Sequence, residues 1–131
     1  MDSTSKNTNK ESKNYYFIHN ELLKRTLVFM HGAGLGRFWA NGSGKVKTED
    51  GRWVKFGSIG SPDIIGYGKD GRFIGVEIKT GESRQSKHQK IFQKVSTNHG
   101  CIYFIVRSTE DFKSLELIIK GEIWKNIKRD Q

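Results

Sequence analysis

The sequence predicts one α/β domain in which a mixed β-sheet is flanked by helices, and three observations lead to this prediction. The chain has 131 residues, which suits one domain with one hydrophobic core. Runs with strand-like alternation stand between segments whose apolar residues recur at the helical period. Asp-Gly turns separate two pairs of those runs, which is typical of hairpins. The expected order of elements is therefore α-β-(ββ)-β-β-α-β-α.

The chain is expected to begin with a tail that leads into a helix. Residues 1–13 carry Met1 as their only apolar side chain, so they cannot bury enough surface to order and should form a disordered polar tail. Residues 14–131 would form the single domain. Its first helix runs from Asn14 to Met30 and ends at a glycine, and a short strand is expected at 37–40.

Two hairpins follow, and the turn of the second sets its register. The first hairpin pairs KVKT with RWVKF, and the second pairs DIIGY with FIGVEIK around Lys69-Asp70-Gly71. A three-residue turn with its glycine in the left-handed region places Ile64 opposite Val76 and Asp63 opposite Glu77. A two-residue turn would shift the pairing by one residue and scatter this cluster, so the prediction depends on the bulge.

The last third of the chain is expected to form a helix, a strand and a helix. Ser86 begins a helix that a glycine stops at Gly100. The apolar run CIYFIVR is typical of a central strand covered on both faces. Ser108 and Asp111 have the spacing of a capping box, which would open a last helix that Gly121 interrupts.

The charge balance favours a polyanionic partner. Lys and Arg total 23 against 14 Asp and Glu, which gives a formal net charge of +9. Nucleic acid is the expected partner, and a basic surface kept for solubility is the alternative.

No stretch approaches the length of a membrane span and the first residues lack the apolar part of a secretory signal, so no membrane association is expected. The lone Cys101 fits a reducing compartment such as the cytoplasm.

Asp63, Glu77 and Lys79 are expected on one face of the second hairpin. Two like charges directly opposed destabilise a strand pair, and a divalent cation between them would remove the conflict. Carboxylate oxygens suit Mg²⁺ or Mn²⁺, and a neighbouring Lys ammonium would orient or deprotonate a water. The alternative is a solvated ion-pair face, and spacing alone does not separate the two interpretations.

Other patterns in the sequence are weaker. GSGKV (42–46) lacks the first glycine and the final Ser or Thr of a phosphate-binding loop, and GAGLG lacks the context of a dinucleotide loop, so no nucleotide cofactor is expected. Tyr103 is expected in the core. The histidines show no zinc spacing with Cys101 and are expected at the surface or at helix ends. They are His19, His31, His88 and His99.

The ordered segments resemble a known nuclease family. GSPDIIG followed by VEIK matches the PD-(D/E)XK nuclease signature through Pro62, Asp63, Glu77 and Lys79. Together with FWANGSG, WVKFG, SKHQ and HGCIYFIVRS, these segments resemble the stand-alone virus-type replication-repair nuclease (VRR-NUC) domain of phage and bacterial type. The same module forms the nuclease domain of Fanconi-associated nuclease. The resemblance covers roughly residues 15–118, with the segments in consistent order.

The resemblance implies a restriction-endonuclease-like core and a Mg²⁺- or Mn²⁺-dependent phosphodiesterase acting on DNA. The family also places an acidic residue in the first helix, for which Glu21 is the choice and Glu11 the alternative. The implied metal ligands are Asp63, Glu77, the backbone carbonyl of Ile78 and Glu21, and the implied catalytic residues are Asp63, Glu77, Lys79, Gln89 and Glu21.

By the same resemblance the protein would be a homodimer that cuts branched DNA, such as a four-way junction or a flap, during replication, recombination or repair in a bacterial or phage-infected cell. The alternatives are a non-catalytic DNA-binding module and an RNA-directed protein on the same fold. The glycine-rich loop 57–61 either approaches a phosphate closely or is a plain turn. Basic side chains either follow a DNA backbone or form a solvated face. The expected DNA contacts are Lys45, Lys47, Arg52, Lys55, Ser61, Lys87 and Lys90.

Overall fold

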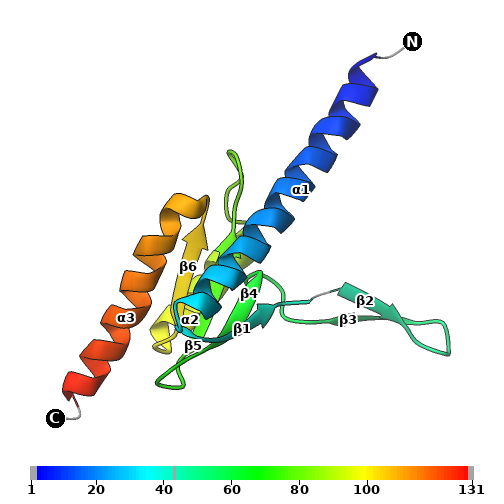
Figure 1. The fold of residues 1–131 in the computed structure, drawn as a ribbon. Helices are drawn as coiled ribbons and strands as arrows, with labels where there is room; N and C mark the ends of the chain where they lie inside the picture. Colours follow the sequence, from blue (N-terminus) through cyan, green and yellow to red (C-terminus); the bar gives the residue numbers. More distant parts are fainter. Residues whose placement is uncertain (1–2, 43, 130–131) are drawn as a thin grey trace.

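The structure is a computed structural model that describes residues 3–42 and 44–129, with side chains described within 17–42 and 44–121. Figure 1 shows the arrangement of its elements. In chain order they are α1 (Ser3–Gly32), β1 (Gly36–Ala40), β2 (Gly44–Lys47), β3 (Trp53–Phe56), β4 (Ile64–Gly68), β5 (Phe73–Ile78), α2 (Lys87–Asn98), β6 (Ile102–Val106), a single 3₁₀ turn η1 (Thr109–Asp111) and α3 (Phe112–Arg129). The predicted order of helices and strands is confirmed.

Four of the strands form one mixed sheet in the order β1-β4-β5-β6. β1, β4 and β5 are antiparallel neighbours, whereas β6 pairs in parallel with β5 and is reached through α2. β2 and β3 form a separate two-stranded sheet, which projects from the body as an arm (Figure 1). A mixed sheet flanked by helices, as predicted, is therefore the architecture of the described chain.

The hydrophobic core lies on one face of this sheet. Ile64, Ile74, Val76 and Ile78 alternate toward that face and are almost completely buried. α1 and α3 cover it, and the stacked rings of Phe29 and Phe112, with centroids 4.8 Å apart, join the two helices. The opposite face carries the residues that alternate with this core, among them the side chain at position 77.

The turn of the second hairpin has the predicted bulge. Gly68 N–H donates to the carbonyl of Arg72 at 2.9 Å, and Gly71 has φ of 82°. A side chain would be strained in that left-handed conformation, which explains the glycine. Ile64 pairs with Val76, so the register predicted from this turn is confirmed.

Three details of the fold differ from the prediction. α1 begins at Ser3, so residues 3–13 are helical; extending a helix that packing has already nucleated costs little even for a polar sequence. α3 continues through Gly121, where a single glycine costs only about 1 kcal/mol. β6 is an edge strand of the sheet, not a central one. Its apolar run is explained by helices on both of its faces, α2 on one and α3 on the other.

No described helix is long and apolar enough to cross a lipid bilayer.

Candidate metal and nucleic-acid site

Asp63 and Glu77 meet where β4 begins and β5 ends. Asp63 Oδ2 accepts a hydrogen bond from the backbone N–H of Ile78 at 2.8 Å, which ties the residue before β4 to the end of β5. The charge of Asp63 acts on the Glu77 carboxyl group, and Glu77 is only 2% exposed. The hairpin thus brings together the two carboxyl groups that the register predicted.

The surroundings of Glu77 favour the protonated form of its carboxyl group. Its pKa is raised from the ordinary value of 4.5 to about 9; burial is the largest cause, and Asp63 acts in the same direction. The positive charge of Lys79 and a hydrogen bond from Tyr103 oppose this rise but do not cancel it. Without a cation, burial and the neighbouring Asp63 therefore act together against the charged form of Glu77.

Tyr103 belongs to this site, although the sequence suggested a core residue. Its hydroxyl donates to Glu77 Oε2 at 3.5 Å and receives a hydrogen bond from Gln85 Nε2 at 3.2 Å. Burial raises the pKa of Tyr103 to about 12, so the hydroxyl remains a donor over the usual pH range. The apolar neighbours of Tyr103 in β6 concealed this role in the sequence.

Lys79 follows Glu77 by two positions and is half-buried. Its backbone N–H donates to the carbonyl of Val106 at 3.0 Å, which continues the pairing of β5 with β6 one step beyond the strand. Its ammonium acts on the Glu77 carboxyl by charge. The backbone of Lys79 is therefore held in place beside the carboxyl pair.

Asn41, which the sequence did not single out, holds residues 61–63 in place before β4 by hydrogen bonds. Its side-chain Nδ2 donates to Ser61 Oγ at 2.7 Å and to the carbonyl of Pro62 at 3.0 Å. Its backbone N–H donates to the carbonyl of Asp63 at 2.7 Å. A Cβ on Gly75 would come within 2.5 Å of Pro62 Cγ, so the ring of Pro62 packs directly on the strand. These contacts fix where Asp63 stands.

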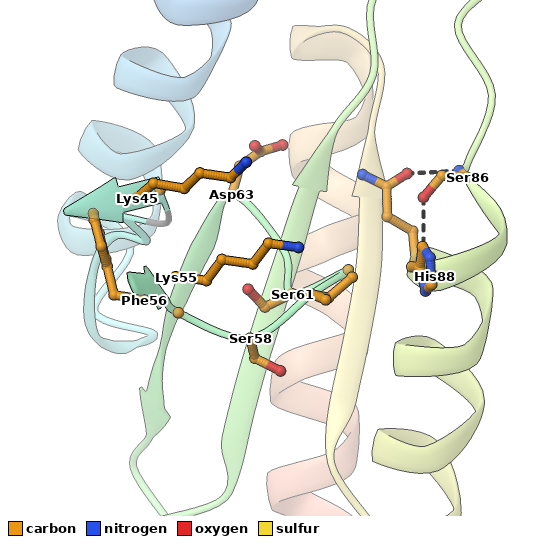
Figure 2. Close-up of a pocket in the computed structure, with 13 residues that line it drawn as sticks. Lys45, Lys55, Phe56, Ser58, Ser61, Asp63, Ser86 and His88 are labelled. Atoms are coloured by element: carbon orange, nitrogen blue, oxygen red, sulfur yellow. Dashed lines mark hydrogen bonds between the residues drawn. The ribbon is translucent and has the colours of Figure 1, made fainter. Parts of the chain in front are cut away.

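An open cleft of about 590 Å³ lies beside Asp63. The β2–β3 arm, the loop 57–61 and the start of α2 form its walls, and Lys45 and Lys55 extend into it from the arm (Figure 2). These two lysines are directly opposed across the hairpin, an arrangement that like charges disfavour unless an anion lies between or beside them. The cleft thus offers positive charge next to the carboxyl pair.

The expected DNA contacts divide into two groups. Lys45, Lys55 and Ser61 line the cleft. The others are exposed and lie outside the set of residues that line it: Lys47, Arg52, Lys87 and Lys90. Arg52 is also engaged locally, since its Nε donates to Asp50 at 2.9 Å.

Gln89 reaches the cleft but has a structural role there as well. Ser86 caps α2, and Gln89 completes the capping box by accepting the Ser86 backbone N–H at 2.8 Å. Figure 2 shows these two hydrogen bonds at the edge of the cleft. Gly60 lies against the same helix end, because a Cβ there would approach the His88 carbonyl to 2.3 Å. The glycine at position 60 therefore serves the packing of the loop on α2.

α1 brings His19 to the site, and this corrects the expectations for both His19 and Glu21. His19 Nε2 lies 3.4 Å from Asp63 Oδ2. Glu21 is two residues further along, about 200° around the helix axis, and lines a different pocket with Arg25 and Arg107. Glu21 is thus not placed beside Asp63. The side chain of the alternative, Glu11, lies outside the described residues.

The donor chemistry of the pair fits a hard divalent cation. Asp63 and Glu77 supply the oxygen donors that Mg²⁺ and Mn²⁺ take, and a cation would replace the proton that Glu77 otherwise keeps. Ile78, whose carbonyl was the expected backbone ligand, contacts Asp63 through its N–H. Within the described part of the chain, no three His, Cys, Asp or Glu side chains already stand as a metal-holding group.

No family model matches the sequence, and no curated protein matches it significantly.

Proposed function

We propose that this protein is a Mg²⁺- or Mn²⁺-dependent nuclease that hydrolyses phosphodiester bonds of DNA, with a PD-(D/E)XK core of the VRR-NUC type. The observation that carries the proposal is the closeness of Asp63 to the buried Glu77, with Lys79 beside them, at the edge of a basic cleft. A buried carboxyl group beside a second carboxyl group is costly, and structural needs alone do not call for one. Branched DNA is the proposed substrate, and a homodimer with two equivalent sites would suit it.

The chain's own groups have distinct roles in this proposal. Asp63 and Glu77 would hold the cation, which when bound would neutralise charge on the scissile phosphate and acidify a water. Lys79 would orient the attacking water and take part in moving its proton. Water adds to phosphorus, one P–O ester bond breaks, and the leaving oxygen is protonated. Lys45 and Lys55 would hold the flanking phosphates in the cleft.

The test is a cleavage assay with the full chain. Four-way junction, flap, single-stranded and linear duplex DNA, and matched RNA, are incubated with Mg²⁺, Mn²⁺ or EDTA. We expect cation-dependent cleavage that EDTA abolishes and that the Asp63→Asn variant lacks. Absence of cleavage with both cations on every substrate would refute the proposal. Equal cleavage by Asp63→Asn would also refute it, because the activity would then come from another site or a contaminant.

Removing the two cleft lysines is expected to weaken DNA binding. The Lys45→Ala/Lys55→Ala variant should bind about tenfold more weakly and show a smaller salt dependence, because it loses two phosphate contacts. Fluorescence anisotropy with Ca²⁺ at several salt concentrations measures this. The matched control, Lys47→Ala/Arg52→Ala, removes the same charge from the same arm but outside the cleft. A loss just as large in the control would show that the cleft is not the contact surface.

A further inference from the structure

Among the histidines that the structure describes, His19 is the one that contacts an acidic side chain. That side chain belongs to Asp63. It stands on the stripe of α1 that faces the sheet, one turn before the buried Leu22 and two turns before Thr26. Both members of the contact are partly accessible, with side chains 30% and 26% exposed for His19 and Asp63. The imidazole is thus held at the candidate metal site by the packing of α1 and can still be reached from solvent.

The separation of the two atoms suits a shared cation. Neighbouring ligands at about 2.1 Å from an octahedral ion stand about 3.0 Å apart. Nε2 of His19 and Oδ2 of Asp63 are 3.4 Å apart, so a shift of a few tenths of an ångström would place both on one ion. The contact is also longer than a well-formed charge-assisted N–H···O hydrogen bond, about 2.7–2.9 Å. The geometry therefore places the imidazole nitrogen within reach of a cation that Asp63 would hold.

We propose that His19 Nε2 is a ligand of the cation held by Asp63 and Glu77, and that it gives this site a preference for Mn²⁺ over Mg²⁺. The inference rests on the proposed function, because it concerns the same cation. Mg²⁺ takes oxygen ligands almost exclusively, whereas imidazole nitrogen is a common ligand of first-row transition ions. One nitrogen beside two carboxylates therefore favours the transition ion.

The competing role for His19 is to position Asp63 without touching the cation. In that role the imidazole would affect Mg²⁺ and Mn²⁺ binding equally, because it would act only on the carboxylate. The two roles thus differ in a quantity that can be measured, the ratio of the affinities for the two cations. They also differ in whether a nitrogen nucleus couples to the bound ion.

The experiment combines pulsed EPR with calorimetry on the full chain. Electron spin echo envelope modulation of bound Mn²⁺ in the wild type should show coupling to an imidazole nitrogen, a readout that needs no variant and no DNA. His19→Ala should lose this coupling and bind Mn²⁺ at least about tenfold more weakly, with Mg²⁺ affinity changed much less. His88→Ala is the matched control, since His88 lines the cleft and should not change the coupling.

The outcomes separate this inference from the proposed function. If Mn²⁺ binds the wild type and Asp63→Asn abolishes the binding, but no nitrogen coupling appears, the inference fails and the metal site stands. Coupling lost in His88→Ala instead of His19→Ala would also refute it, as would equal weakening of Mg²⁺ and Mn²⁺ binding by His19→Ala. If the wild type binds neither cation, both the inference and the proposed metal-dependent nuclease fail. His19→Gln and circular dichroism establish that any loss is not caused by misfolding.

Discussion

Lys79→Ala is expected to slow DNA cleavage by about 10²–10⁴-fold while cation binding changes little. A side chain that orients an attacking water or moves its proton contributes this much to catalysis. Lys79 is half-buried, and its backbone is tied to β6 through Val106, so its side chain starts from a fixed point beside the carboxyl pair. Truncating it removes the ammonium without removing a metal ligand. Single-turnover cleavage rates and Mn²⁺ calorimetry measure the two effects separately.

The comparison variants make the Lys79 result specific. Lys69→Ala removes an equal charge from the exposed turn of the same hairpin and should cleave at nearly the wild-type rate. Asp63→Asn should lose both cleavage and cation binding. Full activity of Lys79→Ala would exclude Lys79 from the chemistry. Loss of cation binding as complete as in Asp63→Asn would show instead that Lys79 supports the metal site, because its charge lowers the pKa of Glu77.

The carboxyl pair could be predicted from the sequence because local chemistry sets it. The Asp-Gly turn requires a left-handed glycine, that glycine sets the bulge, and the bulge sets the register that opposes Asp63 to Glu77. Each step involves residues close together in the chain. The same reasoning predicted the capping of α2 by Ser86, which the structure confirms.

The contribution of α1 could not be predicted in the same way. Helical periodicity indicates which residues share a face, but not how far along the sheet the helix docks. That docking places His19, rather than Glu21, beside Asp63. Tyr103 was missed for a related reason: an apolar run indicates a buried strand but not which buried side chain meets a carboxyl group. In both cases the partners are far apart in sequence.

Glu77→Gln is expected to stabilise the cation-free protein and to abolish cleavage. The pKa of Glu77 is 4.5 in its ordinary state and about 9 in the folded protein. Between these values the unfolded chain has lost the proton that the folded chain keeps, so stability falls as the pH rises. The favourable contribution of the protonated group is fully present below pH 4.5 and is lost progressively toward pH 9, at up to about 1.4 kcal/mol per pH unit.

Glutamine has nearly the same shape as glutamate and does not titrate, so its neutral amide avoids the cost of a buried charge. At pH 7 in EDTA the variant should therefore be more stable than the wild type by up to roughly 3 kcal/mol. The difference should grow from pH 5 to pH 8 in urea denaturation. Glu49→Gln, which changes an exposed residue of the arm, is the control and should leave the pH dependence unchanged.

Addition of Mn²⁺ should reverse the order of the two proteins. A cation that binds only the folded wild type stabilises it by mass action, and Glu77→Gln lacks one of the two carboxylates that would hold the cation. A glutamine variant less stable than the wild type at every pH in EDTA would contradict the buried acid described for position 77. If the crossover occurs, the wild type retains a carboxyl group that destabilises its cation-free state, because the group has a function that glutamine cannot supply.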